Sequence, residues 1–268
     1  MKLNLVPART GVTWVRSGLK TFLRQPLAFV SLFFFFMALV SIVSQVPLIG
    51  TALALMLLPT MTLGLMAASA EAAKAEKGQK PPAAAVFLAA LHAARTGIRP
   101  MLVLGGLYAV LFLLVMAISA LADGGQFAQV YLMGGTVSRE MAESGDFQAA
   151  LWIAMALYLP LSLAFWHAPA LVHWHRVEPV KSIFFSIVAL FRNFGAYALF
   201  GIAWFGVFLI AGIGMGLVAT LLIGVGALGS GGAALAVGNV LIVGTALVLA
   251  AMSLSSTWFT FRDTFEPN

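Results

Sequence analysis

The sequence contains no cysteine and little charge of either sign. Without cysteine the chain has no structural disulfide, no thiolate ligand for a metal and no thiol nucleophile. Only 9% of its 268 residues are charged, whereas about a quarter are charged in a typical soluble domain. Hydrophobic residues make up 62%, and the mean hydropathy is +1.02. This leaves too little polar surface to cover a water-soluble particle, so the composition indicates an integral membrane protein.

Long apolar runs predict the membrane-crossing elements, because about 20 apolar residues cross the hydrocarbon layer as a helix. Six runs are long enough: 27–46, 48–69, 101–121, 148–172, 196–223 and 234–258. None has an acidic or basic residue in its interior. The first follows a long basic lead without a signal-cleavage pattern, so we expect it to be retained. The sequence therefore predicts an all-α polytopic protein with a single membrane domain, 1–268, whose six transmembrane helices form three hairpins.

The basic residues are distributed unevenly among the connections. Of the 15 lysines and arginines, Arg139 alone lies on one side of the six predicted spans, and the rest lie on the other. The positive-inside rule places the richly basic side in the cytoplasm. We therefore expect a multi-pass protein of the bacterial inner membrane with cytoplasmic N- and C-termini.

Three cytoplasmic segments, 12–24, 86–99 and 180–192, have the pattern of amphipathic helices that lie in the membrane interface. The predicted apolar faces of the first and third are Val12, Val15, Leu19, Phe22 and Leu23, and Val180, Ile183, Phe184, Ile187, Val188 and Phe191. Ser182 and Ser186 fall on the polar face of the third.

Basic side chains on these segments are candidates for contact with anionic lipid headgroups. They are Arg16, Lys20, Arg24, Arg95, Arg99, Lys181 and Arg192. Three of them, Arg24, Arg99 and Arg192, each precede a helix breaker and then a span. This recurrence favours an internal repeat of one surface helix and one hairpin, with units at about 8–70, 82–173 and 178–260. The alternative is that any hairpin protein with positive-inside loops would show the same pattern.

Three of the four histidines fall within the segment “HAPALVHWHR”. His167, His173 and His175 do not share a helix face at about 100° per residue, and Pro169 disturbs the helix between them. A metal pair on one helix needs spacings of three or four residues. The interpretation we favour is a polar, aromatic belt at the headgroups, formed with Trp166 and Trp174. A metal site is the alternative, and His167 stays a candidate because intramembrane histidines are often functional.

Prolines and glycines within the spans suggest two further features. Pro59 and Pro160 interrupt the backbone hydrogen bonds of spans two and four, so together with His167 they mark a candidate cavity; simple helix packing is the alternative use. Gly212 and Gly216 have the GxxxG spacing that lets transmembrane helices approach closely. They predict packing within the fold, or a contact with a second copy or a protein partner.

No catalytic arrangement is recognisable in the sequence. The spans contain no carboxylate, and the chain lacks a catalytic triad, zinc motif, phosphate loop or dinucleotide fingerprint. Arg139, Glu140 and Glu143 in the outer loop are interpreted as solvated surface. We therefore expect a protein that is not an enzyme, needs no cofactor, binds no nucleic acid and serves as a membrane scaffold or accessory factor. The alternative is a transporter or lipid-translocating protein with a cavity near the proline-kinked spans.

The segments “FWHAPALV” and “VEPVKSIFFSIVALFRN”, with the N-terminal “VPARTGVTWVRSGLKTFLRQPLAF”, resemble a family of six-helix inner-membrane proteins of beta-proteobacteria. The resemblance extends from the N-terminus to about Phe200. The plan of three units is also similar to YciC-like proteins and to the membrane domain fused to some glycerophosphodiester phosphodiesterases, whose catalytic domain has no counterpart in this chain. The resemblance implies a fold and a location and supplies no activity.

Overall fold

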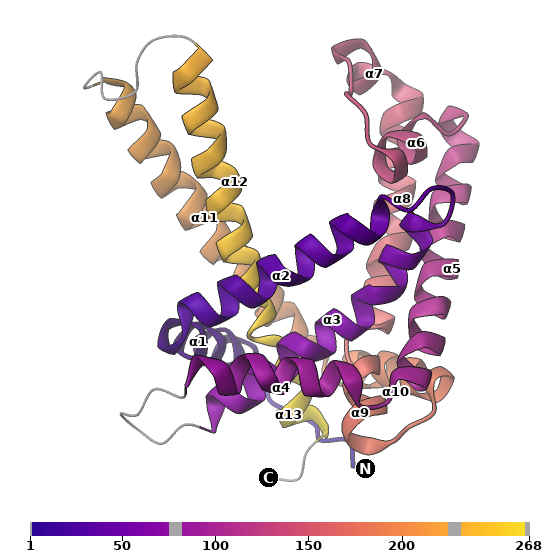
Figure 1. Ribbon diagram of the computed structural model, residues 1–268, viewed down its shortest axis with the longest axis vertical. Coiled ribbons are helices and arrows are strands. Elements are labelled where there is room, and N and C mark those ends of the chain that lie inside the picture. The colour runs from indigo at the N-terminus through magenta and orange to yellow at the C-terminus, as the bar shows by residue number, and fades with distance from the viewer. Residues whose placement is uncertain (1, 75–81, 225–231, 266–268) are drawn as a thin grey trace. The chain divides into compact units, whose positions relative to one another are not determined.

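The computed structural model describes residues 2–74, 82–224 and 232–265, and all regular structure in these ranges is helical (Figure 1). In chain order the helices are α1 (Thr10–Arg24), α2 (Pro26–Ser44), α3 (Gly50–Ala73), α4 (Ala83–Arg95), α5 (Ile98–Asp123), α6 (Gln126–Met133), α7 (Arg139–Glu143), α8 (Gly145–Ala164), α9 (Ala168–His175), α10 (Pro179–Arg192), α11 (Phe194–Gly224), α12 (Gly232–Leu254) and α13 (Thr257–Phe265). Six stretches are long and apolar enough to cross a membrane: Pro26–Ser44, Gly50–Ala73, Ile98–Asp123, Gly145–His175, Phe194–Leu222 and Gly238–Phe265. The predicted all-α polytopic fold is confirmed.

The helices gather into two compact units. The first consists of residues 1–33, 65–89 and 192–268, and the second of residues 34–64 and 90–191. The boundaries pass through α2, α3 and α4, so they do not follow the three expected repeats. The repeat of a surface helix and a hairpin stays a prediction.

The first unit is organised around α1, which packs against α11, α12 and α13. Two glycines bring its backbone very close to these neighbours. A Cβ atom on Gly11 would lie 2.1 Å from the carbonyl oxygen of Ala196, and one on Gly18 would lie 2.4 Å from Cβ of Ser256. Trp14 lies between the two glycines and is completely buried. Small residues thus allow α1 to become part of the protein core.

The face of α1 that packs on the rest of the protein differs from the apolar face expected from the sequence. The structure buries Gly11, Trp14, Val15, Gly18, Thr21 and Phe22. Val12 and Leu23, which the hydrophobic pattern had placed on that face, are exposed. The reason is that α1 packs through its glycines against other helices, and close backbone approach outweighs side-chain hydrophobicity in selecting the buried face.

The second unit is organised around α5, which packs along α8 and also contacts α6 and α9. Gly105 permits a close crossing with α3, because a Cβ there would lie 2.2 Å from the carbonyl oxygen of Met56. A connected set of aromatic rings fills this unit, with neighbouring centroids 5.1 to 6.1 Å apart. Its members are Tyr108, Phe112, Phe127, Tyr131, Phe147, Tyr158 and Phe165.

Two of the predicted spans are broken helices. Span four consists of α8 and α9, separated at residues 165–167. Pro169 explains this break, since it has no amide hydrogen and its ring clashes with the carbonyl group four residues earlier. Span six is interrupted after Leu254, where Ser255 donates a hydrogen bond to the carbonyl of Met252 at 2.7 Å.

The predicted junctions between surface helix and span agree with the structure at two of three positions. Arg24 ends α1 and Arg192 ends α10, where a cation also interacts favourably with the helix dipole. At the remaining junction the break occurs at Gly97, which adopts a positive φ of 85°. Arg99 therefore lies in the first turn of α5, and the expected position of this arginine at the end of the surface helix is wrong. Glycine breaks the chain here because it adopts left-handed φ without strain.

Candidate functional site

The candidate lipid-contact residues are accessible. Arg16, Lys20, Arg95, Arg99, Lys181 and Arg192 are exposed, and Arg24 is half-buried. Lys181 pairs with Glu178 at 2.7 Å on the same helix turn. Exposure of this kind leaves the charges free to meet phosphate groups, and contact with anionic lipid stays a prediction.

The third surface helix, α10, presents a face that the sequence analysis assigned wrongly. Ser182 and Ser186, predicted to lie on a solvated polar face, are completely buried. Val180, Phe184 and Phe191 are exposed. The helix therefore turns its small polar residues toward the protein and leaves bulky apolar side chains accessible to lipid.

Ser186 is buried because it stabilises the break between α8 and α9. Its hydroxyl accepts a hydrogen bond from the backbone N–H of His167 at 3.0 Å and donates one to the carbonyl of Leu163 at 3.2 Å. A broken transmembrane helix leaves such backbone groups without intrahelical partners, so a neighbouring hydroxyl must replace them. The sequence offered only a weak signal for this role, namely two serines spaced four residues apart.

The three residues of the candidate cavity have different surroundings. Pro59 is buried within α3, Pro160 lies on the exposed surface of α8, and His167 is completely buried at the start of α9. None of them lines the pocket beside Arg176 or the groove between α11 and α12. The structure thus does not bring these residues together in those pockets, and the cavity stays a prediction.

The remaining histidines lie at the other end of α9. His173 and His175 are half-buried, and the ring of His173 contacts that of Trp174 edge-on at 5.0 Å. Across the part of the chain that the structure describes, no group of three His, Cys, Asp or Glu residues is placed to hold a metal ion.

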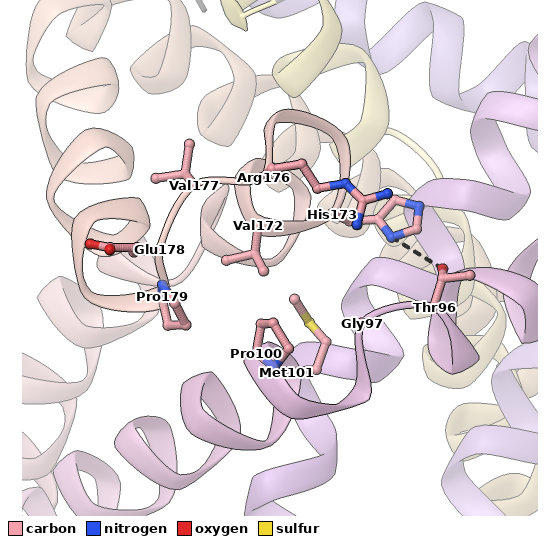
Figure 2. Close-up of a pocket in the computed structure, with 10 residues that line it drawn as sticks. All are labelled: Thr96, Gly97, Pro100, Met101, Val172, His173, Arg176, Val177, Glu178 and Pro179. Atoms are coloured by element: carbon pink, nitrogen blue, oxygen red, sulfur yellow. Dashed lines mark hydrogen bonds between the residues drawn. The ribbon is translucent and has the colours of Figure 1, made fainter.

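A pocket of about 220 Å³, lined by both charged and apolar residues, lies where α9 ends and where α5 and α10 begin (Figure 2). It is lined by Thr96, Gly97, Pro100, Met101, Val172, His173, Arg176, Val177, Glu178 and Pro179. Arg176 and His173 lie together on one side of it, and Nδ1 of His173 is 3.5 Å from Oγ1 of Thr96. Glu178 lies on the opposite side and points away from Arg176. Sequence analysis missed this pocket because Thr96 and His173 are 77 positions apart in the chain.

A second, apolar groove of about 430 Å³ separates α11 from α12. It is lined by Phe208, Gly212, Met215, Gly216 and Ala219 from α11, and by Ile242, Thr245, Ala246 and Leu249 from α12. A Cβ atom on Gly212 or Gly216 would meet nothing within 4 Å. The two glycines therefore do not serve packing within the described fold, which corrects one of the two uses expected for them.

Comparison with known proteins gives the context for these sites. The chain is 39% identical over 267 residues to a protein of Burkholderia thailandensis described as a probable inner membrane protein, with 99% of this chain and 94% of the relative covered. The chain belongs to this inner-membrane family. No family model and no solved structure matches it.

Membership of this inner-membrane family decides the location of the chain. Together with the six long apolar helices it shows a multi-pass protein of the inner membrane, as expected. The family name carries no activity. The specific motif and the similarity to YciC-like proteins stay predictions.

Proposed function

We propose that this member of the inner-membrane family is a scaffold or accessory factor without catalytic activity, which associates with a second copy of itself through the groove between α11 and α12. The observation that carries the proposal is the open glycine face of α11. Gly212 and Gly216 border a groove that no side chain fills.

The geometry of this groove suits a transmembrane helix. At 100° per residue, Gly212, Gly216 and Ala219 fall within about 60° of one another on α11. These small residues line the groove together with Phe208 and Met215. Helices associate in membranes mainly through such small residues, because hydrocarbon offers no hydrophobic drive for the contact. Within the span Phe194–Leu222 the buried residues Ala196, Phe200 and Trp204 all lie near the start, so the rest of α11 would gain new contact area from a partner.

The orientation of the scaffold is supported by a contact between the two ends of the chain. The amide of Asn4 donates to the carbonyl of Thr264 at 2.8 Å, and its side-chain amide donates to the carbonyl of Asp263 at 3.3 Å. Segments bonded in this way lie on the same side of the membrane. Because the basic connections belong to that side, we propose that both termini are cytoplasmic.

The basic residues support a second part of this role, attachment to anionic lipid. On α10, exposed Lys181 and Arg192 flank the exposed side chains of Val180, Phe184 and Phe191. An apolar face bordered by cations is typical of a helix at the membrane interface. The transporter alternative has no comparable support, because Pro59, Pro160 and His167 line neither described pocket.

Disulfide cross-linking tests the proposed association. Because the sequence contains no native cysteine, only the introduced thiols can form a disulfide within this protein. With Ala219→Cys, which places a thiol in the groove, oxidation of native membranes should give a covalent dimer. Adding Gly216→Ile should abolish the dimer because the groove is then filled. Gly214→Ile is the matched control, since Gly214 points away from the groove and also has open space around it. Monomeric Ala219→Cys chains, or equal loss of dimer with both isoleucines, would contradict the proposal.

A further inference from the structure

The pocket at the start of α5 has features that the scaffold function does not use. We propose that it binds a phosphate group, in the form of the phosphodiester of an anionic lipid headgroup or of free phosphate. The inference goes beyond the proposed function and is independent of the α11–α12 groove. A cavity of about 220 Å³ has room for such a group, since a few tens of Å³ suffice for one water molecule.

The cationic side of the pocket is formed by Arg176. This residue caps α9 in a left-handed conformation, with φ of 56°, which places its side chain beside the ring of His173 (Figure 2). Non-glycine residues adopt this conformation infrequently, and here it ends α9 with the backbone N–H of Arg176 donating to the carbonyl of Leu171. Within the described chain Arg176 has no ion pair, so its guanidinium is available for the bidentate contact that arginine makes with phosphate.

Neutral donors and acceptors adjoin the arginine. Thr96 donates its hydroxyl hydrogen to the carbonyl of His92 at 2.9 Å, and this bond fixes its oxygen toward His173. The start of α5 lies at the same wall, at Gly97 and Pro100. The first helical bond of α5 runs from the amide of Met101 to the carbonyl of Gly97. Pro100 has no amide hydrogen, so this helix end offers the pocket few backbone donors, and Arg176 is the main group that would bind an anion.

The carboxylate of Glu178, which also lines the pocket, does not prevent phosphate from binding beside Arg176. Glu178 lies across the pocket from Arg176, and its charge is paired with Lys181 at 2.7 Å. The floor between the two sides is apolar and includes Val172 and Met101. The charges of the pocket are therefore separated, with the unpaired cation at one end.

The surroundings favour a lipid as the source of the phosphate. Leu102 and Val103 follow the pocket on α5 and are exposed, as are Val180 and Phe184 on α10. The acyl chains of a bound lipid would pack along these exposed apolar side chains while its headgroup occupies the pocket.

Native mass spectrometry of the full chain in detergent tests the site, with phosphatidylglycerol or sodium phosphate as the probe. Arg176→Gln should weaken phosphatidylglycerol binding roughly tenfold or more, the effect of losing a charge-assisted hydrogen bond. Arg176→Lys keeps the charge but loses the bidentate contact, so it should weaken binding several-fold and less than Arg176→Gln. If only high concentrations of phosphate displace the lipid, the lipid headgroup is the ligand. If phosphate binds in the absence of lipid, the free anion is the ligand. Either result supports a phosphate-binding site.

Two further arginine variants separate this site from general attraction to basic residues. Arg139→Gln removes the same charge from an exposed ion pair in the outer connection and should leave binding unchanged. Arg95→Gln removes an exposed charge that does not line the pocket and should change binding less than twofold. Equal weakening by Arg95→Gln and Arg176→Gln would overturn the proposal, as would unchanged binding in Arg176→Gln. If Arg176→Gln fails to fold, Arg176→Lys decides, and unchanged binding in that variant would overturn the proposal.

Discussion

Substitution of Gly11 by alanine tests the packing of α1 directly. The added Cβ would lie 2.1 Å from the carbonyl oxygen of Ala196 and 2.7 Å from the backbone nitrogen of Phe200. The first of these distances is about 1 Å shorter than the closest contacts that real Cβ atoms make. Both obstacles are backbone atoms of α11, so no side chain can rotate to make room. Helix α1 would have to move as a whole, and Trp14 would lose part of its completely buried environment.

The magnitude follows from two opposing effects. Overpacking of this kind costs about 1–3 kcal/mol, and the rigid obstacle places this substitution at the upper end. Replacement of a helical glycine by alanine returns up to about 1 kcal/mol through helix propensity. We therefore expect Gly11→Ala to lower the free energy of unfolding by about 2 kcal/mol.

Thermal unfolding in detergent, followed by intrinsic tryptophan fluorescence, measures this effect. At roughly 2–4 °C per kcal/mol, Gly11→Ala should lower the Tm by roughly 4–8 °C. Gly201→Ala is the matched control, because a Cβ there meets nothing within 4 Å, and it should leave the Tm unchanged or raise it slightly. A Gly11→Ala protein that melts at or above the wild-type temperature would refute the close packing of α1 on α11.

Three other predictions address separate contacts. Trp14→Phe removes the indole N–H that donates to Asp263 at 2.9 Å, so unfolding should become easier by about 1–3 kcal/mol in denaturant titrations, and an unchanged stability would contradict this bond. Ser186→Ala removes both hydrogen bonds at the break between α8 and α9, and hydrogen exchange should rise there but not in α11. Single cysteines introduced at Lys2 and at Thr136 should react with a membrane-impermeant maleimide from opposite sides of the inner membrane. Lys2→Cys should react only in inverted vesicles, and labelling of both cysteines from the same side would exclude the proposed topology.

The sequence predicted the helices well because hydrophobicity and charge alone define what can cross a membrane. The six spans, the three surface helices and the break caused by Pro169 all follow from such local properties. Sequence analysis failed where packing against segments distant in the chain determines which face of a helix is buried. Gly11 and Gly18 reduce the hydrophobicity of α1 and yet define its buried face, because their value depends on the helices opposite them.

The candidate site was predictable only in part, for a similar reason. The exposed cations could be found from the uneven distribution of charge. Thr96, His173 and Arg176 could not be combined from the sequence, since they become neighbours only when α5 and α9 are brought together. Ser186 was assigned to water because hydroxyl groups are polar, whereas its role depends on backbone groups exposed by a break in another helix.

The bonds between the N-terminal segment and α13 have a consequence for how the chain is synthesised. Asn4 and Trp14 are synthesised before the six spans, and their partners Asp263 and Thr264 lie at the end of the sixth span. Helix α1 can pack on α11 once the fifth span has been made, but its bonds to α13 must wait until Asp263 and Thr264 emerge from the ribosome. A chain cut short before Asp263 would keep the contact of α1 with α11 but lack these bonds, a difference that quality-control proteases could detect.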